Sequence, residues 1–376
     1  MENIEKIKKI EKDPTYLSER LKDMGVDDYV LNKYKDLIEN IEFININLDS
    51  HAGKVHLKMV GALFSRMEND KTFLKNIIKN VELEEVGKID VSDYSSGEDA
   101  DSEELFALTG MAAENIDLDI GTNRRVNKVD CYLKSGNCIS FTLSADLHRV
   151  GDEESNSSQE KSVFESDFGQ ENPVLQKYYG YFKKDFDGQD SRFIAKEYLP
   201  GKNISHYLNG LSNNDESLLD ISDLSSDLAY SMAYLYKKGN GELVSDLKLE
   251  NIIYNYEDSN EVEYSCRVCD NSGFYSENQK RKSAYQILAH LQSLLSIFNN
   301  KKMLFLRDNK NVEIETKQED VINAYLDSFL ENLDAGSMAV FKNNIKDILN
   351  NPSDKDIFEI DKDILEYASD YLDFFK

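Results

Sequence analysis

The stretch ELVSDLKLENIIYN, residues 242–255, is followed along the chain by CDNSG, residues 269–273. The apolar run IIYN after Asn251 and the run YSCRVC before Asp270 predict two short strands. The polar segment EDSNE between them predicts a turn. Such a hairpin would bring Asn251 and Asp270 together, although 19 residues separate them in sequence.

The side chains around this hairpin are of the types that bind phosphate and a divalent cation. The oxygens of Asn251 and Asp270 are hard ligands, which suit Mg²⁺ or Mn²⁺. The carboxylate of Asp246 can accept or orient the proton of an attacking hydroxyl, and the ammonium of Lys248 can reach a phosphoryl group. A lone D-x-K-x-x-N in a loop usually serves turn or capping chemistry. The interpretation therefore depends on the elements around the motif.

Composition and charge exclude several classes of protein. A chain of 376 residues predicts two or three domains or lobes. Its formal net charge of −27 argues against a nucleic-acid binder, because phosphate backbones are held by clustered Lys and Arg. The sequence has no apolar run of 18 residues and no apolar signal core at its start, so we expect no transmembrane segment and no secretory peptide. Four cysteines suit a reducing compartment, and we expect a cytoplasmic protein.

The pattern of apolar residues divides the chain into three parts. Residues 15–40 and 53–84 have helical spacing, and IEFININL between them alternates like a short strand. The segment DVSDYSSGEDADSEE, residues 90–104, is acidic and predicts a linker. We therefore expect a helical N-terminal domain over 1–105 that ends in this linker. A mostly β part over 106–198 and a mostly α part over 199–376 would follow.

The β part begins with a strong hairpin signal. In KVDCYLKSGNCISFTL, residues 128–143, two alternating runs flank a KSGN turn. A helix near 157–169 follows. RFIAKEYLPGKNISHYL, residues 192–208, then predicts a strand, a break at Pro200-Gly201 and a short helix. Residues 217–238 predict an amphipathic helix, and the chain after 280 looks helical except for MLFLRDNKNVEI.

These motifs resemble the protein-kinase-like superfamily. SDLKLEN is similar to the catalytic loop H-R-D-L-K-x-x-N, with Asp246, Lys248 and Asn251 at the matching positions. CDNSG resembles D-F-G, with Asp270 at the metal-binding position. The segments YYGYF and RFIAKEYLPGKNISHYL resemble strands four and five, the hinge and the helix after it.

The resemblance covers roughly residues 115–300. It implies a bilobal α+β fold, with a β-rich small lobe and an α-rich large lobe, that binds ATP with Mg²⁺ or Mn²⁺. It also implies that the backbone of Glu197, Tyr198 and Leu199 meets adenine.

Several positions depart from the family pattern. Val244 and Ser245 replace the His and Arg of H-R-D, and Asn271 replaces the Phe of D-F-G. No Gly-rich loop is present, and in DIGTNRRVNKV, residues 119–129, we expect Arg124, Arg125 and Lys128 to meet phosphate by charge instead. Only about ten residues separate DNSG from the next predicted helix, as in minimal kinases of secreted bacterial effectors. A short segment of this kind also permits a non-peptide acceptor.

The most serious departure is the absence of the strand-three lysine. If ISFTL matches V-A-I-K, Thr142 stands where the lysine should be, and its hydroxyl cannot neutralise phosphates. Two substitutes remain open. Lys128, at the start of the preceding strand, matches where the with-no-lysine kinases supply theirs, and Lys196 would point inward from the strand before the hinge. Either could pair with Glu160 or Glu165 of the small-lobe helix. Without a carboxylate or phosphate partner, a buried Lys196 would be costly.

The sequence leaves three hypotheses for function. The first is a divergent ATP- and metal-dependent phosphotransferase that modifies Ser or Thr of a protein, acting in the cytoplasm, or in the host cytosol if it is a secreted effector. Its N-terminal helical domain would bind an activator or partner. The second is a pseudokinase, a scaffold or allosteric partner that binds nucleotide without phosphoryl transfer. The third keeps the fold but transfers an adenylyl group or uses a non-protein acceptor.

Overall fold

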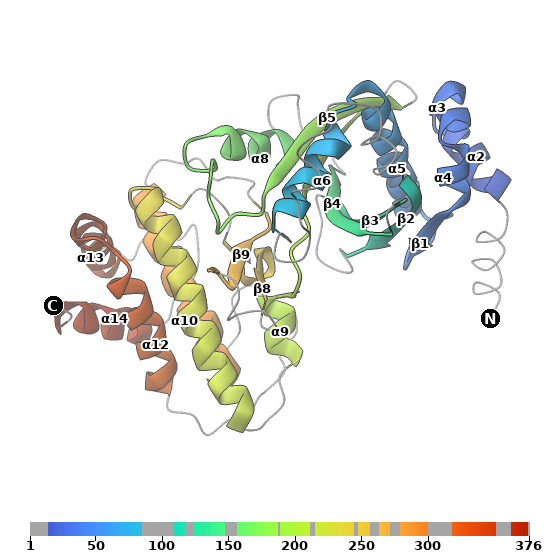
Figure 1. The fold of residues 1–376 in the computed structure, drawn as a ribbon. Helices are drawn as coiled ribbons and strands as arrows, with labels where there is room; N and C mark the ends of the chain where they lie inside the picture. Colours follow the sequence, from blue (N-terminus) through green and yellow to red (C-terminus); the bar gives the residue numbers. More distant parts are fainter. Residues whose placement is uncertain are drawn as a thin grey trace. The chain divides into compact units, whose positions relative to one another are not determined.

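The computed structural model describes twelve stretches of the chain: residues 14–84, 108–116, 124–134, 136–146, 156–186, 189–210, 215–243, 247–255, 263–270, 279–299, 318–350 and 362–374. The chain divides into two compact units. The first comprises residues 1–161 and 177–198, and the second comprises 162–176 and 199–376. The first unit holds a large sheet and the second is mostly helical, which confirms the expected α+β class with a β-rich and an α-rich lobe (Figure 1).

The first unit contains six strands and most of the N-terminal helices. Its elements are α2 (Pro14–Asp23), α3 (Asp28–Lys33), α4 (Lys35–Glu39), β1 (Ile41–Ile44), α5 (His51–Asn69), α6 (Phe73–Glu84), β2 (Leu108–Asn115), β3 (Arg124–Leu133), β4 (Cys138–Asp146), β5 (Tyr178–Phe186) and β6 (Gln189–Glu197). Helix α8 (Asn156–Glu165) begins in the first unit and ends in the second.

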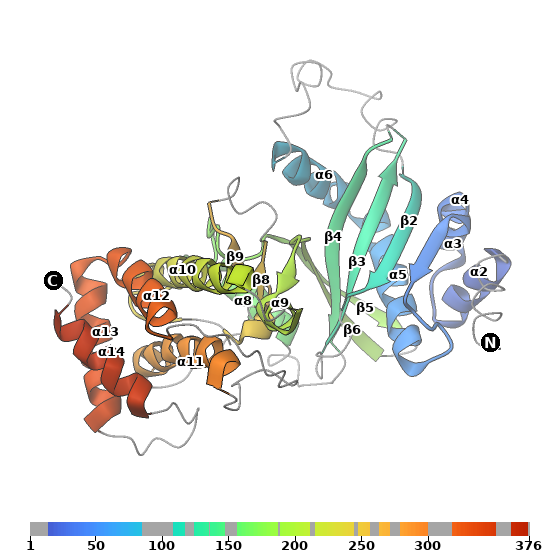
Figure 2. The same cartoon turned by 90° about the horizontal axis from the view of Figure 1, so that it is seen from below.

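The six strands form one sheet in the order β1-β2-β3-β4-β6-β5 (Figure 2). The hairpin β3–β4 is the one predicted from alternation, and its register pairs Val129 with Phe141. Gly136 in its turn has a φ of +89°, a conformation that glycine adopts without strain. The alternating apolar residues of both strands are buried, as expected: Val129, Cys131, Leu133, Ile139, Phe141 and Leu143.

Helix α5 covers the apolar face of this sheet and contacts β3, β4 and β5. Its N-cap is Ser50, whose hydroxyl accepts the backbone N–H of Gly53 at 2.9 Å. Leu57, Leu63 and Phe64 lie on its buried side and belong to the same core cluster as the inward residues of the strands. A fully buried side chain of this size stabilises the fold by about 2 kcal/mol.

The expected separate helical domain over residues 1–105 differs from the arrangement found. The described part of this segment, residues 14–84, lies in the same unit and the same core as the sheet. Strand β1 pairs parallel with β2, so Ile41 lies opposite Met111 and the segment extends the sheet itself. The acidic linker over 90–104 lies outside the described residues.

The second unit contains a small sheet and five long helices among the described residues. Its elements are β7 (Lys202–Asn203), α9 (Ile204–Gly210), α10 (Asp215–Lys238), the 3₁₀ turn η2 (Leu249–Asn251), β8 (Ile252–Tyr254), β9 (Cys266–Val268), α11 (Gln279–Asn299), α12 (Gln318–Glu331), α13 (Ala335–Asn350) and α14 (Lys362–Phe374). The predicted amphipathic helix over 217–238 is α10. The run MLFLRDNKNVEI lies outside the described residues.

Aromatic side chains connect the helices of the second unit. Tyr236 of α10 meets Phe329 of α12 and Phe341 of α13 edge-on, with ring centroids 5.8 and 5.7 Å away. Helix α14 contacts α11 and α13, and Tyr367 donates a hydrogen bond to Asn323 of α12 at 2.8 Å. The C-terminal helix therefore packs on the other helices of the second unit.

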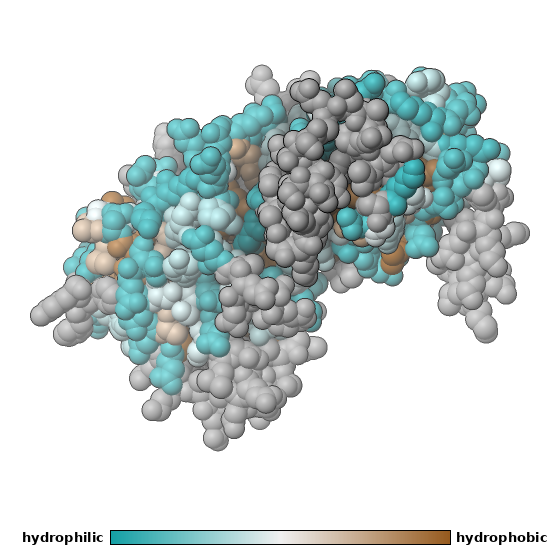
Figure 3. Space-filling model, in the orientation of Figure 1, coloured by the Kyte–Doolittle hydropathy of each residue, from teal (hydrophilic) through white to brown (hydrophobic). Residues whose placement is uncertain are grey.

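The described residues on the face shown in Figure 3 form a strongly polar surface. Hydrophilic residues dominate the coloured surface on the face shown in Figure 3. Among the described residues no helix has the length and apolar character needed to cross a membrane.

Candidate functional site

The predicted hairpin β8–β9 is present and sets the positions of two predicted metal ligands. Ile252 pairs with Val268, and the backbone N–H of Cys269 donates to the carbonyl of Asn251 at 2.9 Å. Asp270 is the next residue after Cys269, so it follows directly on the residue bonded to Asn251. Both Asn251 and Asp270 are half-buried. The hairpin therefore brings these two backbone positions together at its open end.

The second strand of this hairpin is held from both sides. Val268 donates its N–H to Val174 at 2.8 Å and accepts the N–H of Gln176 at 2.9 Å. The guanidinium of Arg267 donates to the carbonyls of Pro173 (2.9 Å) and Leu175 (3.0 Å). Because Asp270 follows this strand by two residues, its position depends on a fixed element and not on a free loop.

Helix α11 anchors the described residues on either side of Asp246. The hydroxyl of Ser283 accepts the backbone N–H of Leu243 at 2.7 Å. Nε2 of His290 contacts the carbonyl of Leu247, and Nδ1 faces the hydroxyl of Tyr325 at 3.4 Å. Asp246 itself, with Val244 and Ser245, lies outside the described residues, so its predicted role stays a prediction.

The contact of His290 also fixes its protonation state. Burial lowers the pKa of His290 to about 4, and the hydrogen bond to Leu247 opposes this shift only in part. A neutral imidazole that donates from Nε2 leaves Nδ1 as the acceptor for the Tyr325 hydroxyl. His290 is thus a core histidine with a hydrogen-bond partner for each ring nitrogen.

Lys248 is the N-cap of the 3₁₀ turn η2, which leads into the hairpin. It has an extended backbone, and its carbonyl accepts the N–H of Asn251 at 2.8 Å. The residue is half-buried. The turn therefore fixes the spacing between Lys248 and Asn251 that the motif predicts.

The three residues weighed for the phosphate-binding position lie in one row across the sheet of the first unit. Lys128 on β3 pairs with Thr142 on β4, and Thr142 pairs with Lys196 on β6. Residues directly opposite each other in antiparallel strands point to the same face. Both lysines therefore share a face with the position where the family lysine would stand.

The hydroxyl of Thr142 is used within the protein. It lies 3.2 Å from the carbonyl of Glu197 and 3.3 Å from that of Lys196, and the residue is buried. Thr142 thus ties β4 to the end of β6.

Lys196 has the carboxylate partner that its burial requires. Its Nζ lies 2.8 Å from Oε1 of Glu160 on α8, and the side chains of Lys196 and Glu160 are 4% and 0% exposed. Glu160 also pairs with Arg124 of β3, whose Nε lies 3.4 Å from Asp146 of β4. Within the part of the chain that the structure describes, Arg124, Lys196, Glu160 and Asp146 therefore form one buried cluster of cations and carboxylates.

Asp146 also sets the start of helix α8. One of its carboxylate oxygens accepts the Ser157 hydroxyl at 2.8 Å and the other accepts the Ser157 N–H at 3.3 Å. The Asp146 carboxylate thus contacts both the start of α8, the helix that carries Glu160, and Arg124, which pairs with Glu160. This arrangement fixes Glu160 beside Lys196.

Three expectations about charged residues need correction. Glu165 is exposed at the end of α8, and Glu160 makes the ion pair with Lys196. Lys128 lies in the middle of β3 because the strand already begins at Arg124. Arg124 is buried and bound to Glu160, so its guanidinium does not extend toward a phosphate.

Lys128 is oriented by two neighbours on the sheet. Its Nζ lies 3.0 Å from Asp130 and 4.8 Å from the centre of the Tyr198 ring. Burial disfavours the ammonium, but the hydrogen bond and charge of Asp130 outweigh it and raise the pKa of Lys128. Lys128 therefore stays a cation at neutral pH.

The hinge residues begin where β6 ends. The N–H of Glu197 donates to Lys177 at 2.9 Å, and its carboxylate accepts the N–H of Lys177 at 2.9 Å. That N–H is thus satisfied within the first unit, and the predicted contact of the hinge backbone with adenine stays a prediction. Tyr198 is half-buried, and Leu199 is the buried first hinge residue of the second unit.

The anchoring contacts of the site carry no local sequence signal. Arg124 and Glu160 are 36 residues apart, Leu243 and Ser283 are 40 apart, and Leu247 and His290 are 43 apart. An arginine beginning a strand, or a serine beginning an apolar helix, is common without such a partner. One indirect indication was available: a lysine expected to be buried at position 196 requires a carboxylate partner.

No family model matches the chain, and no curated protein matches it. A solved structure of a PAN3 pseudokinase mutant from Neurospora crassa is similar, with a TM-score of 0.34 and 14% sequence identity. The match covers 68% of this chain and 61% of that chain.

Proposed function

We propose that the chain is a divergent protein-kinase-like phosphotransferase that uses ATP with Mg²⁺ or Mn²⁺ and transfers a phosphoryl group to Ser or Thr of a protein. The ion pair between Lys196 and Glu160 carries this proposal. The absence of a lysine at Thr142 is the strongest argument against phosphoryl transfer. Lys196 can replace the missing lysine, because it lies on the strand next to Thr142, on the same face of the sheet, and is oriented by the carboxylate of Glu160 on α8.

Each unit supplies residues with separate roles in this proposal. In the first unit Lys196 would neutralise nucleotide phosphates, and Lys128 is a second cation on the same face. In the second unit Asn251 and Asp270 would hold the divalent ion, whose remaining ligands would be phosphate and water oxygens. The ion would stabilise the negative charge on the transferred group. Lys248 would assist at the γ-phosphate, and Asp246 would orient the acceptor hydroxyl.

The backbone supports this arrangement of the second unit. The η2 turn, the β8–β9 hairpin and α11 fix residues on both sides of the motif, as described above. A catalytic group held by such contacts loses less freedom when substrate binds, which is a recurrent source of rate enhancement.

The test is transfer from ATP labelled on the γ-phosphate, with intact mass spectrometry of the products. We expect Mg²⁺- or Mn²⁺-dependent phosphorylation by the full chain that falls by at least about 100-fold in Asp270→Asn and Lys196→Met. The matched controls are Asp320→Asn on α12 and Lys183→Met on β5, both exposed. Equal turnover in the wild type and in Asp270→Asn would contradict the proposal, and a product with the mass of an adenylyl group would favour the alternative chemistry.

The pseudokinase alternative is favoured by a different observation. Glu160 already pairs with Arg124 as well as Lys196, and Asp146 lies beside Arg124 in the same buried cluster. Such a cluster can hold α8 against the sheet without any nucleotide. A pseudokinase that still binds nucleotide would gain about 2.7 kcal/mol in its free energy of unfolding from ATP at a hundred times the dissociation constant, without turnover. A thermal shift with ATP combined with no transfer would decide for this alternative.

A further inference from the structure

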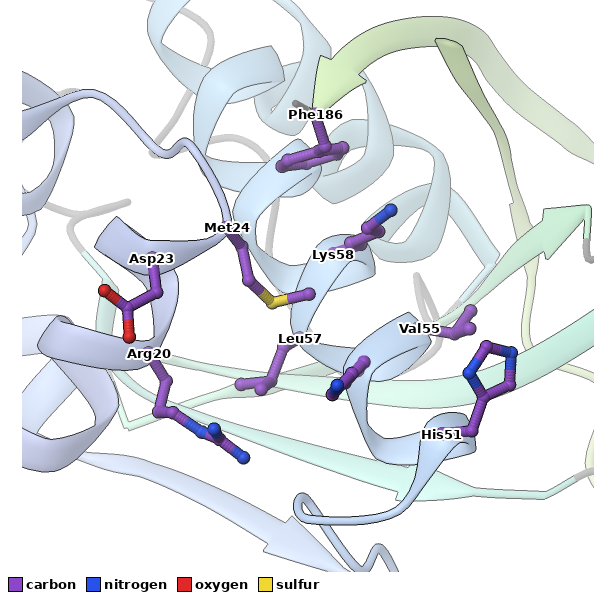
Figure 4. Close-up of a pocket in the computed structure, with 9 residues that line it drawn as sticks. Arg20, Asp23, Met24, His51, Val55, Leu57, Lys58 and Phe186 are labelled. Carbon is purple, nitrogen blue, oxygen red and sulfur yellow. The ribbon is translucent and has the colours of Figure 1, made fainter. Parts of the chain in front are cut away.

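A second candidate binding site lies in the first unit, away from the polar face that carries Lys196. It is a hollow of about 360 Å³ between α2, α5 and the end of β5. This volume falls at the lower end of the range for small-molecule sites. Figure 4 shows the side chains around it. The lining residues are Arg20, Asp23, Met24, His51, Lys54, Val55, Leu57, Lys58 and Phe186.

The rim of the hollow is cationic. Lys54 and Lys58 lie one turn apart on α5, and His51 precedes them on the same face. Within the described residues, no carboxylate forms an ion pair with Lys54 or Lys58. Among the described residues that line the hollow, Asp23 is the single carboxylate. This excess of positive charge stands out in a chain whose net charge is −27.

Arg20 is held in place at one side of the hollow. Its Nη2 donates to Asp49 at 2.9 Å and to the carbonyl of Leu48 at 3.4 Å. Its Nε is a buried donor without a hydrogen-bond partner. The guanidinium is therefore held in a fixed position at the side of the hollow, where it is paired with Asp49.

Two further features define what the hollow can accept. It lies at the N-terminal turn of the 19-residue helix α5, where the helix dipole favours negative charge. Its inner wall is apolar and is made of Met24, Val55, Leu57 and Phe186. The ammonium of Lys58 lies 5.8 Å from the centre of the Phe186 ring, so cation and apolar wall meet at one point.

We propose that this hollow binds a small anion with an apolar body, such as an aromatic or aliphatic phosphate monoester. The anionic group meets Arg20, Lys54 and Lys58, and the apolar body contacts Met24 and Phe186. The site involves none of the residues assigned to phosphoryl transfer. Its failure and that of the proposed function are therefore separate outcomes.

The experiment uses phenyl phosphate as the probe and the methyl group of Met24 as the reporter. The full chain has eight methionines, which can be labelled with ¹³C at the methyl group and observed by NMR. The Met24 signal is assigned from Met24→Leu. We expect a saturable shift of this signal and no comparable shift of Met338 in the second unit. In Lys54→Ala/Lys58→Ala the affinity should fall about fivefold, because each lost ion pair near the surface is worth about 0.5 kcal/mol.

The controls separate charge from shape. Lys22→Ala/Lys35→Ala removes two exposed lysines that pair with Asp28 and Glu39 outside the hollow, and it should leave the affinity within about twofold. Phenol, which lacks the charge, and inorganic phosphate, which lacks the apolar body, should each bind at least about fivefold more weakly. The proposal is overturned if Met24 does not respond or if Lys54→Ala/Lys58→Ala binds as tightly as the wild type. Binding of phenol or inorganic phosphate as strong as that of phenyl phosphate would also overturn it.

Discussion

The ammonium of Lys196 on β6 lies 2.8 Å from the carboxylate of Glu160 on α8, and both side chains are almost fully buried. This pair connects β6, an inner strand of the sheet, to helix α8. Removing one partner of a buried pair costs about 3–5 kcal/mol, because the other charge is left uncompensated. The pair therefore affects stability whether or not the chain transfers a phosphoryl group.

The two partners should differ in their importance for stability. Glu160 pairs with both Lys196 and Arg124, so replacing Glu160 removes the partner of two cations. Replacing Lys196 leaves Glu160 paired with Arg124. We therefore expect Glu160→Gln to lower the free energy of unfolding by about 3–5 kcal/mol and Lys196→Met to lower it by less. Urea unfolding followed by circular dichroism measures both. Glu165→Gln, an exposed position on the same helix, is the control, and an equal loss in Glu160→Gln and Lys196→Met would refute the shared role of Glu160.

The stability of the protein should decrease at mildly acidic pH. Burial lowers the pKa of His56 and of His290 to about 4, from an ordinary value of 6.5. In the unfolded chain these two histidines are therefore protonated near pH 6.5, whereas in the folded chain they are protonated only near pH 4. Stability is retained above pH 6.5 and falls as pH decreases from there, by about 2 kcal/mol for each histidine at pH 5.

Urea unfolding at pH 7 and pH 5 tests this dependence. In His56→Gln the loss between the two pH values should shrink by about 2 kcal/mol, whatever the substitution does to stability at pH 7. His206→Gln changes an exposed histidine and should leave the loss as it is in the wild type. The assignment fails if His56→Gln and the wild type lose the same stability between pH 7 and pH 5.

The sequence was informative where periodicity and turn chemistry act over a short range. The hairpin signal in residues 128–143 and the strands on either side of EDSNE both correspond to observed strands. The lysine at 196 was also informative, since a strand residue pointing inward requires a counter-charge. In each of these cases the deciding residues lie within one hairpin or one strand.

Contacts between distant segments could not be predicted in this way. Strand β1 pairs with β2 although about 70 residues separate Ile41 from Met111, and no short-range pattern indicates such a parallel partner. The two strands of a parallel pair do not specify each other through a turn. For the same reason the sequence predicted a separate domain over residues 1–105, whereas the described part of it, residues 14–84, shares the core of the sheet.

Two glycines with positive φ should respond differently to substitution by alanine. Gly201 follows the hinge with a φ of +106°, and an added Cβ would lie 2.3 Å from the carbonyl oxygen of Tyr254. Gly136 has a φ of +89°, but an added Cβ would meet nothing within 4 Å. We expect Gly136→Ala to cost about 1–2 kcal/mol from backbone strain alone.

Gly201→Ala adds a steric clash to the same strain, so its cost should exceed that of Gly136→Ala by at least about 1 kcal/mol. Thermal unfolding of the two variants measures the difference. Equal melting temperatures would show that the approach between Gly201 and Tyr254 contributes nothing to stability.

The contact between Ser283 and Leu243 should matter for both stability and turnover. Leu243 precedes the motif that carries Asp246, and its buried N–H donates to the Ser283 hydroxyl at 2.7 Å. Replacing Ser283 by alanine leaves this donor without its acceptor, which should cost about 1–3 kcal/mol in urea unfolding. If the motif acts in phosphoryl transfer, kcat should fall while the dissociation constant for ATP measured by calorimetry stays within about twofold, because the change affects alignment and not nucleotide contacts.

Ser293 provides the matched control on the same helix. It is also fully buried, but its hydroxyl donates to the carbonyl of Ala289, one turn earlier on α11. Ser293→Ala should therefore cost less than about 1 kcal/mol and leave kcat unchanged. A loss of kcat in Ser293→Ala equal to that in Ser283→Ala would mean that α11 supports the fold in general. A loss confined to Ser283→Ala would support a role of this helix in aligning the segment between Leu243 and Leu247.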